Sequence, residues 1–439
     1  MKKTLLLLLL TLLTATSTPA RDFTYTYEGQ TLTYTVIDED AKTCETKGNS
    51  NTNGTVHSIS GSLTIPSSAD GYTVTAIGEN SFRDCSNITE LTIPTTVSSI
   101  NDNAFRGCSG LTSVTLPVSY IGSSAFSICS GLTSVTFTES LKSIEDVAFE
   151  NCDRLTSVYI PKFCTSVGYG AFSDCSNLLS IEVDPENEKY TSSDGVLFNK
   201  DFTRLVQYPA GIEGDYIIPE SVRRIEEYAF CGCTGLTSIS IPESITAISK
   251  CSFKSCIGLT SISIPESVRS IGAFAFEYCS GLSSVKIPNA VSSIGICAFA
   301  NCDGLTSISI PESVESIGLV AFSCKNLTEV HCFMQQPCSS LLNYFSSETY
   351  ENATLYVPTG TVSLYKATTP WDKFLNITDE PLLSGIEDIV ADGVDAIDYT
   401  RPYEVYNLQG ALLGQSTDSL AAGIYILRQG EKSTKVAIR

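Results

Sequence analysis

The chain has 439 residues, of which 42% are hydrophobic and only 17% are charged, and its formal net charge is −21. Nucleic-acid binding needs a basic surface, so this acidity argues against DNA or RNA as a partner and also disfavours anionic lipid. A negative surface of this size is equally consistent with simple solubility.

The first twenty residues predict an export signal. Lys2 and Lys3 form a basic start, residues 5–13 are an apolar run, and Thr18-Pro19-Ala20 has the small residues of a cleavage site. The run is too short to span a bilayer, and no later stretch approaches the roughly 20 apolar residues of a transmembrane helix. We expect a signal peptide at 1–20, no transmembrane segment, and an exported mature protein.

Residues 21–66 follow with an alternating pattern. Phe23, Tyr25 and Tyr27 alternate with polar residues, and Leu32, Tyr34 and Val36 do the same after a short gap. This period of two is typical of β-strands. We therefore expect an N-terminal β cap over 21–66, built around a hairpin.

Between residues 67 and 332, phenylalanine recurs at nearly constant intervals, most of them 23 residues. A period of this size indicates a solenoid. In the unit that begins at Leu236, the apolar Ile239 and Ile241 alternate with polar residues, which predicts a short strand, and Pro242 prevents that strand from continuing. The repeat phenylalanines are Phe82, Phe105, Phe126, Phe149, Phe172, Phe230, Phe253, Phe276, Phe299 and Phe322.

The predicted fold is a leucine-rich-repeat-like solenoid of about eleven 23-residue coils. We expect a parallel β-sheet on one face and short strands, turns and short helical segments on the others. The gap of 58 residues between Phe172 and Phe230 fits two coils plus an insertion, so a longer inserted coil is expected at 181–222. Stacked coils bury each other's cores and need end caps, and 333–379, which contains Trp371 and Phe374, is the expected C-terminal cap.

Seventeen cysteines in an exported chain first suggest disulfides. Ten of them recur two or three residues after the repeat phenylalanine, which predicts a stacked column of buried thiols whose parallel side-chain directions suit a disulfide poorly. Cys332 and Cys338, outside the column, are the best candidates for a real pair. The ten are Cys85, Cys108, Cys129, Cys152, Cys175, Cys233, Cys256, Cys279, Cys302 and Cys324.

The repeat unit resembles the BspA-type leucine-rich repeats of bacterial surface proteins. The resemblance is carried by SISIPESVESIG at 307–318 and by the Ala-Phe and Cys elements at 298–302, and it extends over residues 60–379. The irregular segment at 181–222 and the ending LYVPTG…LYKATTPWDKF at 355–374 are similar to the long coil and the cap of that family. The resemblance implies an extracellular adhesion or host-interaction protein that is not an enzyme.

The C-terminal tail resembles a second family. An acidic linker is expected at 380–398, followed at 399–439 by three or four short strands with turns at Gly410 and Gly423. The segments YEVYNLQG, LAAGIYIL and KVAIR look like the C-terminal sorting domain of the type IX secretion system of Bacteroidetes, which implies export and attachment to the cell surface. The alternative is a small β-module without a secretion role.

The sequence offers few candidate catalytic residues. His57 and His331 are the only histidines, and neither belongs to a Cys-His or Ser-His-Asp arrangement, so both are interpreted as surface residues. The absence of CxxC pairs argues against zinc. The acidic residues between Asp184 and Asp194 could ligate calcium but lack EF-hand spacing, and a solvated loop is the favoured interpretation. No catalytic residue, metal site or cofactor is predicted.

The outward side of the predicted strands carries the main functional hypothesis. Small hydroxyls form a repetitive ribbon suited to an extended ligand bound through many weak contacts, with scattered larger groups as anchors. The alternative is that Ser and Thr merely suit soluble strands. The ribbon contains Ser113, Thr115, Ser134, Thr136, Ser157, Ser180, Ser284, Ser307, Ser309 and an interrupting Glu90. The predicted ligand-binding residues are Tyr159, Glu182, Lys286, Glu329, His331, Ser238, Ser240, Ser261 and Ser263.

These observations predict a secreted or cell-surface binding protein. The first hypothesis is an adhesin whose partner is a host extracellular matrix protein, a mucin or other glycan, or another cell surface. The second is an envelope scaffold or glycan-capture accessory protein without an adhesin role. A hydrolase is the third and weakest hypothesis, because the outward positions are dominated by Ser and Thr rather than by paired carboxylates.

Overall fold

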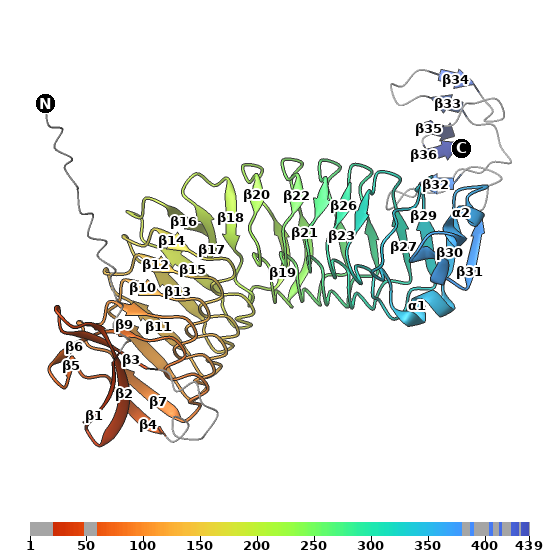
Figure 1. Ribbon diagram of the computed structural model, residues 1–439. Coiled ribbons are helices and arrows are strands. Elements are labelled where there is room, and N and C mark those ends of the chain that lie inside the picture. The colour runs from red at the N-terminus through yellow and green to blue at the C-terminus, as the bar shows by residue number, and fades with distance from the viewer. Residues whose placement is uncertain are drawn as a thin grey trace, which may run out of the picture.

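The computed structural model describes residues 21–47 and 59–379, together with five strands between residues 387 and 438. The chain forms an elongated solenoid in which successive coils lie side by side along the long axis (Figure 1). The predicted solenoid fold is confirmed. The expected export signal and His57 lie outside the described residues.

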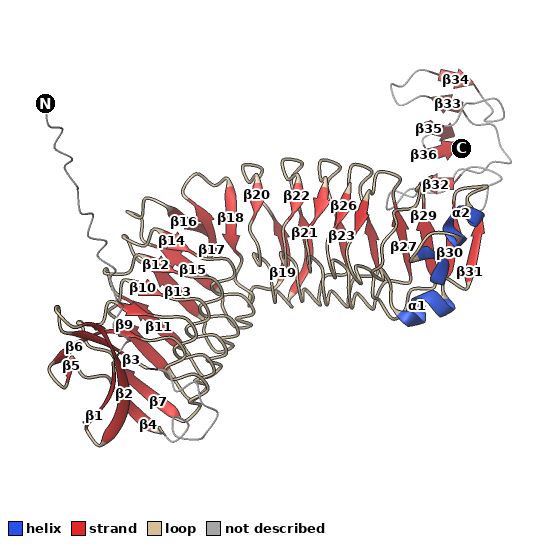
Figure 2. Ribbon diagram, in the orientation of Figure 1, coloured by secondary structure: helices blue, strands red, loops and turns tan. Residues whose placement is uncertain are grey.

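Each regular coil has three sides. In one example, the long strand β9 (Ser113–Leu116) is followed by the two-residue strand β10 (Tyr120–Ile121), and a turn that contains Phe126 completes the coil. Figure 2 shows the strands as two series with loops between them. We call the outer surfaces of these sides the long-strand face, the short-strand face and the turn face.

The long-strand face is built from fourteen strands, more than the predicted eleven coils provide. The difference arises at the ends, because β4, β30 and β31 lie in segments that were expected to be caps. The ring column continues into the C-terminal one, where Phe345 stacks on Phe322. The strands are β4 (Gly61–Thr64), β7 (Ile88–Thr92), β9, β11 (Ser134–Phe137), β13 (Ser157–Ile160), β15 (Ser180–Val183), β19 (Gly214–Ile217), β21 (Leu236–Ser240), β23 (Ser261–Ser263), β25 (Ser284–Lys286), β27 (Ser307–Ile310), β29 (Glu329–Cys332), β30 (Thr354–Val357) and β31 (Asn376–Asp379).

The short-strand face forms parallel ladders of its own. The first runs from the N-terminal cap to β14, and the next begins in the antiparallel strands of the long coil. The strands are β6 (Tyr72–Ile77), β8 (Ser99–Ile100), β10, β12 (Ser143–Ile144), β14 (Ser166–Val167), β18 (Arg204–Gln207), β20 (Arg224–Ile225), β22 (Ala247–Ile248), β24 (Ser270–Ile271), β26 (Ser293–Ile294) and β28 (Ser316–Ile317).

The turn face contains tight turns where short helical segments were expected. Asn103 and Gly107, on either side of Phe105, have φ angles of +55° and +76°. Residues with left-handed backbone geometry this close together interrupt any run of helical dihedral angles. Within residues 67–332 the structure assigns no helix, so this detail of the prediction is wrong.

The core is a column of stacked rings beside a column of thiols. Consecutive repeat phenylalanines such as Phe126 and Phe149 stack with their ring centroids 5.2 Å apart and their planes 2° from parallel. Most thiols of the column donate to the phenylalanine carbonyl of the preceding coil; Cys129 Sγ, for example, lies 3.2 Å from Phe105 O. The thiols that do so are Cys108, Cys129, Cys152, Cys175, Cys256, Cys279, Cys302 and Cys324. All ten column cysteines are buried and free, which confirms their interpretation as core thiols.

The two ends close the core with different elements. At the N-terminus, β1 (Asp22–Tyr27) and β2 (Gln30–Asp38) form the predicted hairpin, and β3 (Thr43–Thr46) pairs in parallel with β6, which β5 (Ser68–Ala69) flanks. At the C-terminus, the cap contains helix α1 (Ser347–Asn352), helix α2 (Val362–Lys366) and the 3₁₀ turn Trp371–Lys373. Trp371 is fully buried and packs edge-on against Tyr344, Phe345 and Tyr365.

Cys332 and Cys338, the best candidates for a disulfide, do not form one. Both cysteines are free, and separate tyrosines engage them. The Tyr365 hydroxyl donates to Cys332 Sγ at 3.1 Å, and Cys338 Sγ lies 3.6 Å from the Tyr344 hydroxyl. The two thiols are therefore part of the polar packing beneath Trp371.

One coil departs from this plan, and we define the long coil as residues 180–213. It contains β15 and then three antiparallel strands, β16 (Tyr190–Ser193), β17 (Val196–Asn199) and β18. All four residues of β17 are buried. Their side chains alternate between two separate hydrophobic clusters, with Val196 and Phe198 in the C-terminal cluster and Leu197 in the N-terminal one. The long coil therefore divides the core of the solenoid in two.

A five-stranded antiparallel sheet is described beyond the solenoid. Its order is β32-β36-β35-β33-β34. The segment 380–398, which was expected to be a linker, contributes one strand to this sheet. That strand, β32, pairs with β36. The strands are β32 (Glu387–Ile389), β33 (Glu404–Tyr406), β34 (Leu412–Gly414), β35 (Gly423–Gln429) and β36 (Lys432–Ile438).

Candidate functional site

The long-strand face presents two regular columns of outward side chains. The parallel pairing of β9 with β11 places Ser113 beside Ser134 and Thr115 beside Thr136. These four side chains are exposed, whereas Val114 between them is buried. Because strands lie about 4.8 Å apart, fourteen of them form a face about 60 Å long.

Tyr159 and Glu182 are brought together on this face. They are register partners on β13 and β15, and the tyrosine is 47% exposed. The Tyr159 hydroxyl donates to Asp184 Oδ2 at 2.8 Å, a bond that lowers the pKa of the Asp184 carboxyl and raises the pKa of the tyrosine. Ser192 donates to Glu182 Oε2 at 3.2 Å. This group offers an exposed ring beside two carboxylates.

A second group lies beyond the long coil. Ser261 pairs with Ser284, and Ser263 pairs with Lys286, on β23 and β25. The Lys286 ammonium lies 2.6 Å from Glu266 Oε1, and both side chains are more than half exposed. The predicted Ser238 and Ser240 are exposed on β21, the preceding strand of the same face. This part of the face is a hydroxyl surface with one paired charge.

The third group surrounds His331. Its Nε2 lies 3.5 Å from Glu329 Oε2, and its ring stacks on Tyr356 with the centroids 4.7 Å apart and the planes 10° from parallel. Ser309 is the partner of His331 on the other neighbouring strand. The histidine is partly buried and forms no Cys-His or Ser-His-Asp arrangement with these neighbours.

The acidic loop uses its polar atoms for internal contacts. Asn187 is fully buried, its Nδ2 donates to Pro161 O and Cys164 O at 2.9 Å, and its Oδ1 accepts from the Lys189 and Tyr190 amides. Glu186 pairs with Lys162 at 2.6 Å. Within the described residues, no group of three or more His, Cys, Asp or Glu side chains is arranged to hold a metal ion.

A shallow depression lies at the N-terminal end of the long-strand face. It spans β7, β9 and β11 and is lined by Glu90, Thr92, Thr115 and Thr136, among others. Its floor is formed by the strands themselves. The hydroxyl columns are therefore accessible as an open trough rather than as an enclosed pocket.

The nine predicted residues thus fall into three groups along one face. The sequence analysis placed Asp184 in a solvated acidic loop rather than beside Tyr159, and it did not single out Tyr356 and Ile217, which belong to the same surface. Tyr356 could have been found, because Leu355, Tyr356 and Val357 continue the alternation of the repeat strands. Ile217 occupies the position of Ser240 and is 74% exposed. The Tyr159–Asp184 contact joins different coils, and local sequence does not show it.

Comparison with known proteins is consistent with this architecture. The model of the BspA type leucine-rich repeat region matches in six copies, at residues 75–193, 214–328 and 246–364, which is more than half of the chain. The chain belongs to the BspA type leucine-rich repeat family. Among curated proteins, none matches it by sequence.

Two solved structures show the same fold as this BspA type chain. The pneumococcal vaccine antigen PcpA has a TM-score of 0.60 at 23% identity, covering 82% of this chain and 98% of its own. A leucine rich cell surface protein from Faecalibacterium prausnitzii A2-165 has a TM-score of 0.50 at 23% identity, covering 79% and 97%. Within the part of the chain that the structure describes, no helix is long and apolar enough to cross a membrane.

Proposed function

We propose that this chain is a non-catalytic binding protein, exported and displayed on a bacterial surface, whose long-strand face holds an extended ligand. The observation that carries the proposal is the in-register alignment of small hydroxyls, interrupted by the Tyr159 and His331 groups. The predicted export signal, the sorting-like tail and the solved cell-surface relative with this fold support the location.

The face suits a long ligand because its chemistry repeats with the coil spacing. A single Ser or Thr contributes little binding free energy, but a chain that runs along the columns meets a hydroxyl at most of the strands. The exposed Tyr159 ring and the stacked His331 and Tyr356 pair supply larger contacts at separate points. A host matrix protein, a mucin or another extended glycan has this form.

The test is binding of the full mature chain to an array of matrix proteins, mucins and glycans. A triple variant, Tyr159→Ala, His331→Ala and Tyr356→Ala, is compared with Tyr278→Ala, which removes a ring of nearly the same exposure, 48%, from the turn face. We expect the triple variant to weaken binding at least tenfold and the control to change it less than twofold.

Two results would count against the proposal. Equal losses from the triple variant and from Tyr278→Ala would place the ligand elsewhere. Failure of the unmodified chain to bind any member of the array would contradict the adhesin role and favour the envelope scaffold, which copurification of envelope components would then support.

A further inference from the structure

The short-strand face carries an arginine cluster in an otherwise acidic molecule. Every arginine between residues 155 and 400 lies on or directly before one of three short strands, β18, β20 and β24. All of these side chains are exposed. We define the arginine stripe as Arg204, Arg223, Arg224 and Arg269.

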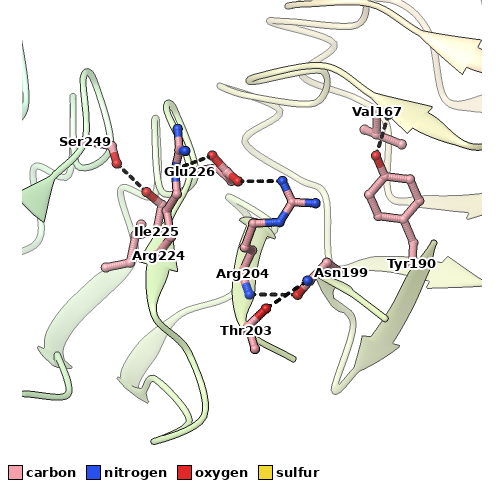
Figure 3. Close-up of polar contacts among 9 residues, drawn as sticks. All are labelled: Val167, Tyr190, Asn199, Thr203, Arg204, Arg224, Ile225, Glu226 and Ser249. Carbon is pink, nitrogen blue, oxygen red and sulfur yellow. Dashed lines mark hydrogen bonds and ion pairs between the residues drawn. The ribbon is translucent and has the colours of Figure 1, made fainter. Parts of the chain in front are cut away.

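A buried carboxylate holds two members of the stripe in place. Arg204 and Arg224 are register partners on parallel strands. Arg204 Nη1 lies 3.2 Å from Glu226 Oε1 and Arg224 Nε lies 2.9 Å from Oε2, while the Glu226 side chain is only 3% exposed (Figure 3). The second contact is an ion pair without hydrogen-bond geometry, since Oε2 accepts no hydrogen bond. Glu226 therefore orients two guanidinium groups from beneath.

The stripe keeps an excess of positive charge. Two arginines share the single charge of Glu226, and their side chains remain 50% and 51% exposed. Arg223 Nη1 donates to the carbonyls of Glu220 and Val222, which are neutral acceptors. Each guanidinium has five N–H donors, so most donors of the stripe face solvent.

The dimensions of the stripe limit what can bind it. The strands β18, β20, β22 and β24 follow one another, so the stripe extends about 14 Å along the solenoid. The chain turns from the long-strand face to the short-strand face at a repeated Pro-Glu-Ser sequence. The glutamates of these turns next to the stripe, Glu220, Glu243 and Glu266, are exposed. These carboxylates would repel a broad polyanion such as duplex nucleic acid but leave room for a single narrow chain.

We propose that the arginine stripe binds a polysaccharide chain that carries sulfate or carboxylate groups. Guanidinium groups match both anions with paired N–H donors, and the arrangement of Arg204 and Arg224 over Glu226 pre-organises two of them. The site is separate from the long-strand face. At physiological salt, charges more than about 8 Å apart are largely screened, so a bound chain interacts with the stripe and its flanking glutamates and little with the distant acidic faces.

The first experiment measures binding of the full mature chain to dextran sulfate, to polygalacturonate and to unsubstituted dextran at physiological ionic strength. The test variant is Arg223→Gln with Arg269→Gln, neither of which contacts Glu226. The matched control, Arg106→Gln with Arg154→Gln, removes the same charge elsewhere. We expect the test variant to weaken binding of the anionic polymers at least tenfold and the control less than twofold, with no binding of dextran.

A second variant tests the role of Glu226 as a positioning residue. Glu226→Gln makes the surface more positive, so a site that acts through charge alone would bind dextran sulfate more tightly. We expect binding to weaken several-fold instead, in protein whose thermal unfolding shows it to be folded.

Several outcomes would overturn the inference. These are unchanged binding in the Arg223 and Arg269 variant, an equal loss in the control, tighter binding after Glu226→Gln, or a preference for duplex DNA over dextran sulfate. Relative binding of the two anionic polymers distinguishes sulfate from carboxylate as the recognised group. The triple variant of the long-strand face should leave dextran sulfate binding unchanged, so failure of one site is distinguishable from failure of the other.

Discussion

The regular coils and the long coil share one plan but bury different residues at equivalent positions. In the regular coils, a phenylalanine and a cysteine recur at the same two core sites. Each ring stacks on its counterpart in the next coil, and a thiol such as Cys279 donates to the phenylalanine carbonyl of the preceding coil. In the long coil, Tyr208 takes the place of the phenylalanine and stacks on Phe230 with the centroids 5.0 Å apart. At a further core position, outside the thiol column, Asn187 lies 23 residues after Cys164 of the preceding coil.

The regular coils supply even stabilisation, whereas the long coil carries residues and contacts that occur only once. Repeated contacts distribute stabilisation evenly along the solenoid, because each coil interacts with its nearest neighbours. The long coil interrupts that regularity, since β17 packs into both hydrophobic clusters and the Val167 amide donates to the Tyr190 hydroxyl at 2.9 Å instead of to a strand (Figure 3). Arg204, Arg224 and Glu226, which are not repeated in other coils, lie on the short-strand face next to the long coil.

The largest expected effect is in the ring column. Replacing Phe253, which is fully buried between two other rings, with alanine should lower the free energy of unfolding by about 3–5 kcal/mol. Urea denaturation measures the change. The control Phe163→Ala removes a ring that is 46% exposed and should cost about 1 kcal/mol or less. Equal costs for the two variants would show that the ring column does not hold the coils together.

The next effect tests the long coil. Asn187→Ala removes four hydrogen bonds at a buried site, two donated by Nδ2 and two accepted by Oδ1, so it should lower the free energy of unfolding by about 2–3 kcal/mol. Hydrogen exchange should locate the loosening at residues 184–193. The control Asn326→Ala removes one hydrogen bond, to Asp303 O, from an exposed residue. A cost near zero at Asn187 would mean that the coil tolerates interruption without this amide.

A smaller effect is expected from alkaline pH in the thiol column. Burial raises the pKa of Cys129 to about 12, above the ordinary thiol value of 9.0. The folded thiol therefore holds its proton more tightly than the unfolded one, so its stabilisation is complete below pH 9 and is lost as the pH rises towards 12. Cys129→Ala should reduce the fall in unfolding free energy between pH 9 and 11 by up to about 1.4 kcal/mol per pH unit. The half-buried Cys297 serves as the control, and an identical slope for both variants would contradict the prediction.

The smallest effect is at the surface of the long coil. Lys162→Ala breaks an ion pair with Glu186 in which both side chains are substantially exposed. Such pairs contribute about 0–1 kcal/mol, so the midpoint of urea denaturation should barely move. A loss comparable to that of Asn187→Ala would show that the charged loop, rather than the buried amide, holds the long coil in place.

Much of the architecture could be predicted from repetition. The spacing of Phe126 and Phe149 identifies one coil, and the alternation around Ser238 assigns the inward and outward sides of a strand. These features are local, because an apolar side chain at a repeated position must turn inward for neighbouring coils to share a core. The predicted hydroxyl columns follow from the same rule.

The sequence by itself determined the solenoid, its repeat length, its buried thiols and its family. Tertiary structure alone decided where the pattern is broken. Asn187 reads as part of an acidic loop but is buried, and Glu226 reads as one charge among many but holds Arg204 and Arg224 across adjacent strands. The reason is physical: a repeated side chain meets its own copy in the next coil, whereas a unique one has a partner set by the stacking of different coils.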